Sequence, residues 1–247
     1  VGYQSKIQDS LKISYNSLDE FIKALVKGIK TPVRKFNDIG MFDDAGIAQQ
    51  ISTGILQIEN ELYDIVRPKR SGPSGSRPAK LLKTDGIEYL ELRGIDINPF
   101  IPEGIDVNKI KLLDIFITHS LISESPLMLD KEINEIRSNQ KIMVSEGRLK
   151  NIMLSKNGDS VSLTELRKNF LAELEQTAEA LDEYSEGYLK AFHHEISKSK
   201  LPSEKILNDM EDKGYEFQDY ALNQTKKIAQ KYKSLSVTDF SALTNSA

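Results

Sequence analysis

The chain has 247 residues, of which 39% are hydrophobic and 28% are charged, and it has no cysteine and a formal net charge of −4. This composition predicts a folded protein with one large domain or two small ones; it excludes disulfides and cysteine-based metal centres, and it argues against generic nucleic-acid binding, which needs a basic surface. No apolar run approaches the roughly 20 residues that span a bilayer, and residues 1–16 lack the pattern of a signal peptide, so we expect a cytoplasmic protein that binds neither nucleic acid nor membrane.

The first helix signal lies near the N-terminus. Residues 17–20 form a capping box, in which a serine hydroxyl and a glutamate carboxylate each satisfy a backbone N–H at a helix start. Apolar residues follow at helical spacing, which predicts an amphipathic helix over residues 18–30 that ends at residues 31–32, Thr-Pro. Residues 33–50 contain turn-forming residues and predict a loop, with a short helical turn near residues 33–39.

Two stretches alternate between apolar and polar side chains and predict strands, residues 51–63 and residues 87–93. In the second stretch Glu91 and Arg93 point to one face. At strand spacing they stand roughly 6 to 7 Å apart, which is close enough to hold a divalent ion and an anion side by side. An exposed sheet face shows the same alternation without any function, and the pattern alone favours that interpretation.

A basic loop is expected between the two strands, over residues 67–83. Its glycine, proline and serine residues predict irregular backbone. The loop concentrates cations in an acidic chain: Arg67, Lys69, Arg70, Arg77, Lys80 and Lys83. Arginine binds phosphate through two hydrogen bonds and lysine adds a point charge, so this loop is a candidate phosphate clamp. A charged surface loop without function explains the pattern equally well.

After residue 100 the sequence is mainly helical. Asp106 is the expected N-cap of a buried helix that runs to Leu121, and His119 in that helix is expected to pack rather than to bind a metal. Further helices are predicted within residues 127–150 with Ile133, Ile136 and Ile142 inward, from a capping box at residues 162–165 to a break near Gly187, from Ser203 to Gly214, and from Tyr215 to Tyr232. Known phosphate-binding loops, zinc motifs and hydrolase motifs are absent, so any nucleotide must be held by carboxylates, metal ions and arginines.

Two strings of the sequence together resemble one known family. They are LQIENELYDIVRPKR at residues 56–70 and GIEYLELRGIDINPF at residues 86–100. Both are similar, in content and in spacing, to segments of the bacterial glutamate-cysteine ligases (γ-glutamylcysteine synthetases), and the resemblance covers about residues 1–150 well and the later helices loosely.

The resemblance implies an α+β fold. It is expected to contain part of a largely antiparallel sheet of the glutamine synthetase-like carboxylate-amine ligase type, followed by a helical C-terminal region. Residues 1–125 would then be the C-terminal part of the catalytic sheet region, with the basic loop at residues 67–83, and residues 126–247 would be mainly helical.

The same resemblance implies an ATP-dependent ligation, the first step of glutathione biosynthesis. In that family the γ-carboxylate of glutamate is phosphorylated, and the amine of cysteine attacks the γ-glutamyl phosphate to give γ-glutamylcysteine, ADP and phosphate, with Mg²⁺ bridging the phosphates. Carried over position by position, the roles would be these: Glu91 a magnesium ligand, Arg93 a catalytic residue that stabilises the transferring phosphate, Tyr3 and Tyr63 parts of the cysteine pocket, and Arg67, Lys69 and Arg70 contacts to the phosphates of ATP.

One departure from the family restricts this expectation. Complete members are about twice as long, and their first half supplies further acidic ligands, a histidine ligand and more of the substrate pocket. We therefore expect the chain to be a C-terminal half whose missing N-terminal half is its partner, and to be inactive alone. Gly94 stands where the family usually has serine.

Two alternatives remain open. In the first alternative, the chain is a non-catalytic helical interaction module that retains a degenerate ligase sheet. In the second it belongs to a related carboxylate-amine ligase with a different amine acceptor. ADP release measured with ATP, magnesium, glutamate and a series of amino-acid acceptors separates these possibilities.

Overall fold

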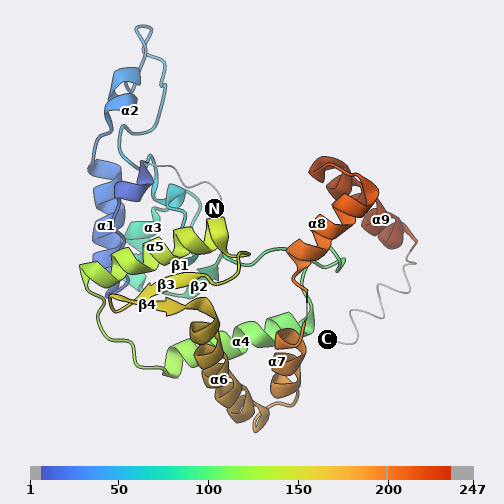
Figure 1. Cartoon of the computed structure of the whole chain (residues 1–247). Coiled ribbons are helices and arrows are strands. Elements are labelled where there is room, and N and C mark those ends of the chain that lie inside the picture. Colours follow the sequence, from blue (N-terminus) through green and yellow to red (C-terminus); the bar gives the residue numbers. More distant parts are fainter. Residues whose placement is uncertain (1–6, 199, 235–247) are drawn as a thin grey trace. The chain divides into compact units, whose positions relative to one another are not determined.

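The computed structural model describes residues 7–198 and 200–234. Contacts divide the chain into a sheet unit, which comprises residues up to Ile95 and residues 124–167, and a helical unit, which comprises residues 96–123 and residues from Lys168 onward (Figure 1). None of the helices in the described ranges has both the length and the apolar composition that crossing a membrane requires.

The sheet unit contains short 3₁₀ helices, α-helices and four strands. In chain order these are η1 (Gln8–Ser10), α1 (Leu18–Lys30), α2 (Arg34–Ile39), η2 (Glu59–Glu61), β1 (Val66–Lys69), α3 (Pro78–Asp85), β2 (Tyr89–Leu92), α5 (Asp130–Glu146), β3 (Met153–Lys156) and β4 (Asp159–Ser162). The helical unit contains α4 (Val107–Ile122), α7 (Tyr188–Ile196), α8 (Pro202–Lys213), α9 (Phe217–Lys233) and most of α6 (Leu163–Asp182). The described strands form two antiparallel pairs, so the predicted α+β class is confirmed.

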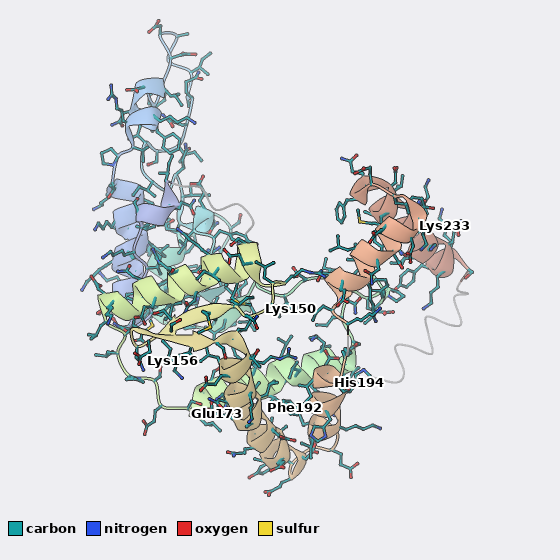
Figure 2. The ribbon with its side chains drawn as sticks, viewed as in Figure 1. Lys150, Lys156, Glu173, Phe192, His194 and Lys233 are labelled. Atoms are coloured by element: carbon teal, nitrogen blue, oxygen red, sulfur yellow. The ribbon has the colours of Figure 1, made fainter. Side chains whose placement is uncertain are left out.

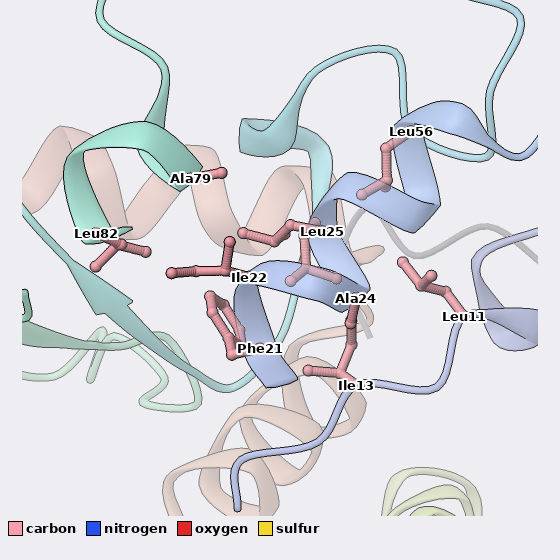
Figure 3. Packing of buried hydrophobic residues seen from close by; sticks show 10 residues of the cluster. Leu11, Ile13, Phe21, Ile22, Ala24, Leu25, Leu56, Ala79 and Leu82 are labelled. Atoms are coloured by element: carbon pink, nitrogen blue, oxygen red, sulfur yellow. The ribbon is translucent and has the colours of Figure 1, made fainter. Parts of the chain in front are cut away.

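Helix α1 organises the core of the sheet unit. The Ser17 hydroxyl accepts a hydrogen bond from the Glu20 backbone N–H at 3.2 Å, which confirms the predicted capping box and helix start. The apolar side of α1 packs against Leu11, Ile13, Leu56, Ala79 and Leu82 (Figure 3). Leu56 comes so close to the helix that a Cβ added at Gly28 would lie 2.8 Å from the Leu56 Cδ1 atom, and only glycine fits there.

The strand predicted over residues 51–63 is wrong. That segment contains no strand and forms η2 instead. Its buried residues are Gly54, Leu56, Glu59 and Leu62, and the last three of them are three apart around η2, as in a helical turn, rather than two apart as along a strand. The strand predicted over residues 87–93 is confirmed at its centre as β2.

The prediction of a continuous basic loop over residues 67–83 is also wrong. Strand β1 contains its first residues and α3 its last, which leaves residues 70–77 as irregular backbone. The prolines in β1 and α3 are compatible with these two elements. Pro68 lacks an N–H but belongs to a strand with a free edge, and Pro78 occupies the first turn of α3, where a backbone N–H has no helical partner.

Strands β3 and β4 form a hairpin that turns at Asn157-Gly158. Both turn residues have positive φ, 58° and 91°, as a tight two-residue turn requires. Helix α5 packs on this hairpin and is tied to it by Asn139, whose side-chain amide both donates to and accepts from the backbone of Ser155. Ile133 and Ile142 of α5 are half-buried, but the prediction for Ile136 is wrong because that side chain is exposed.

Helices α4, α6 and α7 share the core of the helical unit. Phe192, labelled in Figure 2, is fully buried in it together with Ile115 and Ala178. Asp106 caps α4 as predicted and accepts from the Lys109 N–H at 2.8 Å. The prediction that α4 is buried is wrong, because Ile115 is its only buried residue.

The helix ends in the second half of the chain follow the sequence in most places. Ser162 accepts from the Glu165 N–H at 3.2 Å at the start of α6. Gly214 ends α8 in left-handed backbone, as predicted, and Gly187, near which a break was predicted, has left-handed backbone as the N-cap of α7 after α6 has ended at Asp182. The predicted Ser203 cap is wrong, because α8 begins at Pro202 without a side-chain cap. The segment from residue 235 onward, expected to be frayed, lies outside the described residues.

Candidate functional site

The pairing of β1 with β2 gathers charged side chains on one side of the sheet. Arg67 pairs with Glu91 and Lys69 with Tyr89, and paired residues of an antiparallel ladder point to the same face. Arg93 lies two residues beyond Glu91, and its N–H continues the ladder by donating to the Ile65 carbonyl at 2.7 Å. We call the side that carries Arg67, Lys69, Tyr89, Glu91 and Arg93 the cationic face. It holds three cations and one carboxylate.

Glu91 and Arg93 form an ion pair on the cationic face. Arg93 Nη2 donates to Glu91 Oε1 at 3.1 Å and lies 3.0 Å from Oε2. This hydrogen bond, helped by the positive charges of Arg93, Lys69 and Arg67, lowers the pKa of Glu91 although partial burial opposes ionisation. Glu91 is therefore ionised at neutral pH.

The second oxygen of Glu91 is the chemically informative atom. Oε2 is buried and accepts no hydrogen bond from any described residue. An ionised carboxylate oxygen in this state fits a divalent cation such as Mg²⁺, which prefers oxygen ligands. No group of three or more His, Asp or Glu side chains in the described ranges is arranged to hold a metal ion, so Glu91 does not belong to a complete ligand set there.

Tyr63 is held next to this ion pair. The Arg93 guanidinium carbon lies 5.1 Å from the centre of the Tyr63 ring, which is a cation–π distance. The structure therefore brings together Glu91, Arg93 and Tyr63 from two segments about thirty residues apart. Tyr3, the other tyrosine assigned to the substrate pocket, lies outside the described residues.

Arg67 is a buried cation that lacks strong partners. Its residue is 3% exposed, Nη1 donates to the Asn60 carbonyl at a long 3.5 Å, and Nε has no hydrogen-bond partner among the described residues. Burial and the nearby charge of Arg93 lower the pKa of Arg67, although an arginine remains charged at neutral pH. A buried guanidinium in this state favours binding of an anion, because the anion would offset the free-energy cost of removing the guanidinium from water.

The two remaining cations of the expected phosphate contacts differ in position. Lys69 stands on the cationic face opposite Tyr89. Arg70 is instead tied to neighbouring chain, since its Nη1 donates to the Asp85 carbonyl at 2.9 Å and its Nε lies 3.9 Å from a Glu88 carboxylate oxygen. The structure brings Lys69 to Glu91 and Arg93 and does not bring Arg70 there.

Tyr15 is a supporting residue that the sequence did not reveal. Its hydroxyl lies 2.9 Å from an Asp64 carboxylate oxygen and 2.8 Å from the Val66 carbonyl, so it ties down the chain between Tyr63 and β1. Burial, together with the negative charge of Asp64, raises the pKa of Tyr15 above its usual range, so the hydroxyl keeps its proton and donates. The partners are about fifty residues apart in sequence, and no local pattern connects them.

Arg77 also has a role that the sequence did not indicate. Its Nη2 and Nε lie 2.9 Å and 3.0 Å from the same oxygen of Glu59, whose side chain is buried. This arginine pairs the one buried carboxylate of η2, so it is a structural residue rather than a phosphate contact of the basic loop.

A cavity of about 310 Å³ lies beside Tyr63 in the sheet unit. Leu11, Ile13 and Leu62 give it apolar walls, while its charged lining residues are one carboxylate and two cations: Asp64, Arg137 and Lys141. Arg137 also donates to the Leu11 carbonyl at 2.9 Å, which fixes the guanidinium. The size and the presence of charges of both signs suit a small zwitterion such as an amino acid.

Comparison with known proteins gives a consistent result. The family model described as glutamate-cysteine ligase matches residues 1–143. The glutamate–cysteine ligase of Alcanivorax borkumensis is 37% identical over 234 residues, which are 91% of this chain and 45% of that protein. The glutamate–cysteine ligase of Pseudomonas fluorescens Pf-5 is 35% identical over 240 residues, which are 95% of this chain and 45% of that protein. A crystal structure of glutamate–cysteine ligase from Francisella tularensis in complex with AMP matches with a TM-score of 0.84 and 25% identity, covering 98% of this chain and 49% of that one. The chain therefore spans about half the length of the proteins that it matches.

Proposed function

The chain belongs to the glutamate-cysteine ligase family, and from this premise we propose that it is one part of an ATP-dependent ligase that joins the γ-carboxylate of glutamate to the amine of cysteine. The observation that carries this proposal is the ion pair of Glu91 and Arg93 on the cationic face. A protein that catalyses phosphoryl transfer needs to form few covalent bonds itself. It acts mainly by placing positive charge around the phosphate that is being transferred.

Glu91 and Arg93 divide this task. The Oε2 atom of Glu91, which accepts no hydrogen bond from the described residues, would hold Mg²⁺, which when bound neutralises charge on the phosphates. Arg93 is the catalytic residue that would stabilise the phosphoryl group as it passes from ATP to the glutamate γ-carboxylate. The Tyr63 ring contacts the Arg93 guanidinium through a cation–π interaction. This contact would help to hold the guanidinium, which has Glu91 as its carboxylate partner.

Arg67 and Lys69 would contact the phosphates of ATP. Arg67 is buried without a strong partner, and Lys69 stands next to it on the same face, so an anion placed there gains two cations. Arg70 belongs to the same proposal with weaker support, because it is engaged by Asp85 and Glu88. The AMP in the similar ligase from Francisella tularensis supports nucleotide binding by the complete protein.

The cavity beside Tyr63 would hold an amino-acid substrate. Its opposite charges, Asp64 and Arg137, match the ammonium and the carboxylate of cysteine, and Tyr63 would form one wall. Tyr3 keeps its proposed role in the same pocket. The amine of cysteine would then attack the γ-glutamyl phosphate and release phosphate, as the first step of glutathione biosynthesis requires.

The rest of the ligase is the proposed partner of this chain. Glu91 does not belong to a complete ligand set in the described ranges, and the chain spans 45% of its relatives, so we propose that the remaining metal ligands come from outside it and that the chain alone is inactive. The catalytic part proposed for residues 1–125 and the helical part proposed for residues 126–247 differ from the contact units, because residues 96–123 belong to the helical unit and residues 124–167 to the sheet unit. We expect the complete enzyme to act in the cytoplasm.

The test is ADP release by the complete protein that contains this sequence. We expect release only when ATP, magnesium, glutamate and cysteine are all present, and none from the 247-residue chain alone. A complete, folded protein that releases no ADP under these conditions contradicts the proposal. Activity with another amino acid in place of cysteine would keep the ligase chemistry and change the acceptor.

A further inference from the structure

Gly94 directly follows Arg93 of the candidate site, and its surroundings leave no room for a side chain. A Cβ atom added at Gly94 would lie 2.7 Å from the Cγ2 atom of Ile65. Carbon atoms in contact normally stay about 3.5 to 4.0 Å apart, so a side chain at this position must displace Ile65 by about 1 Å. Gly94 is not among the glycines with positive φ, so its backbone conformation does not oppose alanine or serine. The obstacle is the Ile65 side chain.

Ile65 belongs to the segment that aligns the candidate site. Its carbonyl accepts the hydrogen bond from the Arg93 N–H at 2.7 Å, and its own N–H donates to the Asp64 carboxylate at 2.8 Å. Tyr63, two residues earlier, provides the ring that contacts the Arg93 guanidinium. Because a β-branched side chain is stiff at χ1, a push on Ile65 is expected to shift the backbone that aligns Arg93 and Tyr63.

The close contact gives a physical meaning to the departure at position 94. The family usually has serine there, and this chain has glycine. A serine would place its Cβ atom where Ile65 now packs. In this chain the residues at positions 65 and 94 are therefore coupled, and a change at one has to be judged together with the other.

We propose that Gly94 is a positioning residue of the ligase. Its missing side chain lets Ile65 lie against the backbone next to Arg93, and this keeps the Arg93 guanidinium in contact with Tyr63. The serine that is usual in the family would then impair this ligase, and shortening Ile65 would relieve the impairment. The inference rests on the proposed function only where it assigns Arg93 a task in phosphoryl transfer.

Rotation of the Ile65 side chain is the competing outcome. Ile65 is 44% exposed, so a new side chain at position 94 could turn it toward solvent and leave the backbone in place. The Arg93 guanidinium would then keep its contact with Tyr63, and activity would not change. The experiments below separate this outcome from a shift of the backbone.

ADP release by the complete ligase is the first test. We expect Gly94→Ala and Gly94→Ser each to lower kcat roughly tenfold or more, because a displacement of about 1 Å at a reacting group is costly. The KM for ATP should stay within about twofold, since Arg67 and Lys69 lie outside the contact of Gly94 with Ile65. An unchanged kcat in both variants overturns the proposal, and so does a loss in Gly94→Ser alone, which would come from the hydroxyl.

Rescue by a second substitution tests whether Ile65 is the cause. In the Ile65→Ala background, adding Gly94→Ala should change kcat by less than about threefold, because the obstructing side chain is gone. An equal loss in both backgrounds overturns the proposal. Urea denaturation of the same four proteins supplies a further criterion. If Gly94→Ala lowers only the free energy of unfolding and the folded protein keeps its kcat, the role is structural and the proposal is wrong.

Hydrogen exchange of the Arg93 amide tests the geometry without any activity. We expect this amide to exchange about tenfold faster or more in Gly94→Ala, and to regain its protection in the double variant with Ile65→Ala. A protected Arg93 amide in Gly94→Ala indicates rotation of Ile65 alone and overturns the proposal.

The two readouts also separate this proposal from the proposed function. An active ligase in which Gly94→Ala changes neither kcat nor the Arg93 amide removes the positioning role and keeps the function. A complete protein that releases no ADP, but whose Arg93 amide responds as expected, removes the function and keeps the coupling of positions 65 and 94.

Discussion

Both units bury a charged side chain, Arg67 in the sheet unit and Glu195 in the helical unit, but they satisfy these charges differently. Glu195 has a lysine on each oxygen: Lys109 lies 2.6 Å from Oε2, and Lys198 is bonded to Oε1. Burial opposes ionisation of Glu195, but these two hydrogen bonds outweigh it and lower its pKa. Arg67 has one long hydrogen bond and a free Nε in the described structure.

The difference distinguishes a buried charge that stabilises the fold, Glu195, from one that we propose binds a ligand, Arg67. A buried charge costs several kcal/mol unless it is paired, and the helical unit pairs Glu195 with Lys198, three residues away, and with Lys109 of α4. The sheet unit leaves Arg67 and one oxygen of Glu91 incompletely bonded on the same face. Incomplete bonding of opposite charges at one place indicates a site whose remaining partners are a ligand or another segment.

The largest expected effect concerns Arg93. In the complete ligase, Arg93→Ala should lower the rate of ADP release roughly 10²- to 10³-fold, about 3 to 4 kcal/mol, because it removes charge that stabilises the transferring phosphate. Arg34→Ala, at an exposed position of α2, is the matched control and should change little. A comparable loss of ADP release in both variants would contradict a specific role of Arg93 in phosphoryl transfer.

The next effect concerns the paired charge. Glu195→Ala should lower the free energy of unfolding by about 2 kcal/mol, because it leaves Lys109 and Lys198 partly buried without their carboxylate. Urea denaturation of the chain measures this, with Glu211→Ala at an exposed position of α8 as control. A change below about 0.5 kcal/mol, the usual size for a surface substitution, would remove the contrast between the two units.

The pH dependence of this pair has a definite sign. The pKa of Glu195 is lower in the folded chain than in the unfolded chain, so its contribution to stability is present above the ordinary glutamate pKa of about 4.3 and is lost as the pH falls through the folded value. The stability difference between the chain and its Glu195→Gln variant should therefore be constant from pH 7 to about 5 and shrink below about pH 4. Urea denaturation across this range checks it, and a difference that grows toward acid pH is the opposite result.

The smallest expected effect on stability concerns Arg67. Arg67→Met replaces an incompletely bonded buried charge by an apolar side chain of similar length, so the free energy of unfolding should change by less than about 1 kcal/mol or increase. The same variant of the complete ligase should show a raised KM for ATP. A large loss of stability would mean that Arg67 is a structural cation like the lysines of Glu195.

Local signals predicted the helix starts, and they did so for a physical reason. Ser17, Asp106 and Ser162 each accept a hydrogen bond from a backbone N–H three residues later, so the whole interaction lies within four residues of sequence. Glu91 and Arg93 were identified as a pair for the same reason, because a strand places alternate residues on one face.

Interactions between distant segments could not be predicted in this way. The contacts of Tyr15 with Asp64 and of Arg77 with Glu59 depend on how separate segments pack. Residues 51–63 resembled a strand because their apolar residues alternate over a short distance, whereas Leu56 and Leu62, which pack in the core with α1, are six residues apart with the short helix η2 between them. A pattern in a short segment does not show which neighbour will cover it.

Pro68 has a consequence for how copies of this protein associate with one another. Exposed sheet edges are starting points for aggregation, since each added strand normally creates a new edge for the next. Pro68 has no N–H to donate at the β1 edge of its sheet, so a strand added there would lack one ladder hydrogen bond. A neighbouring copy would therefore be held less well at β1 than at a strand without proline.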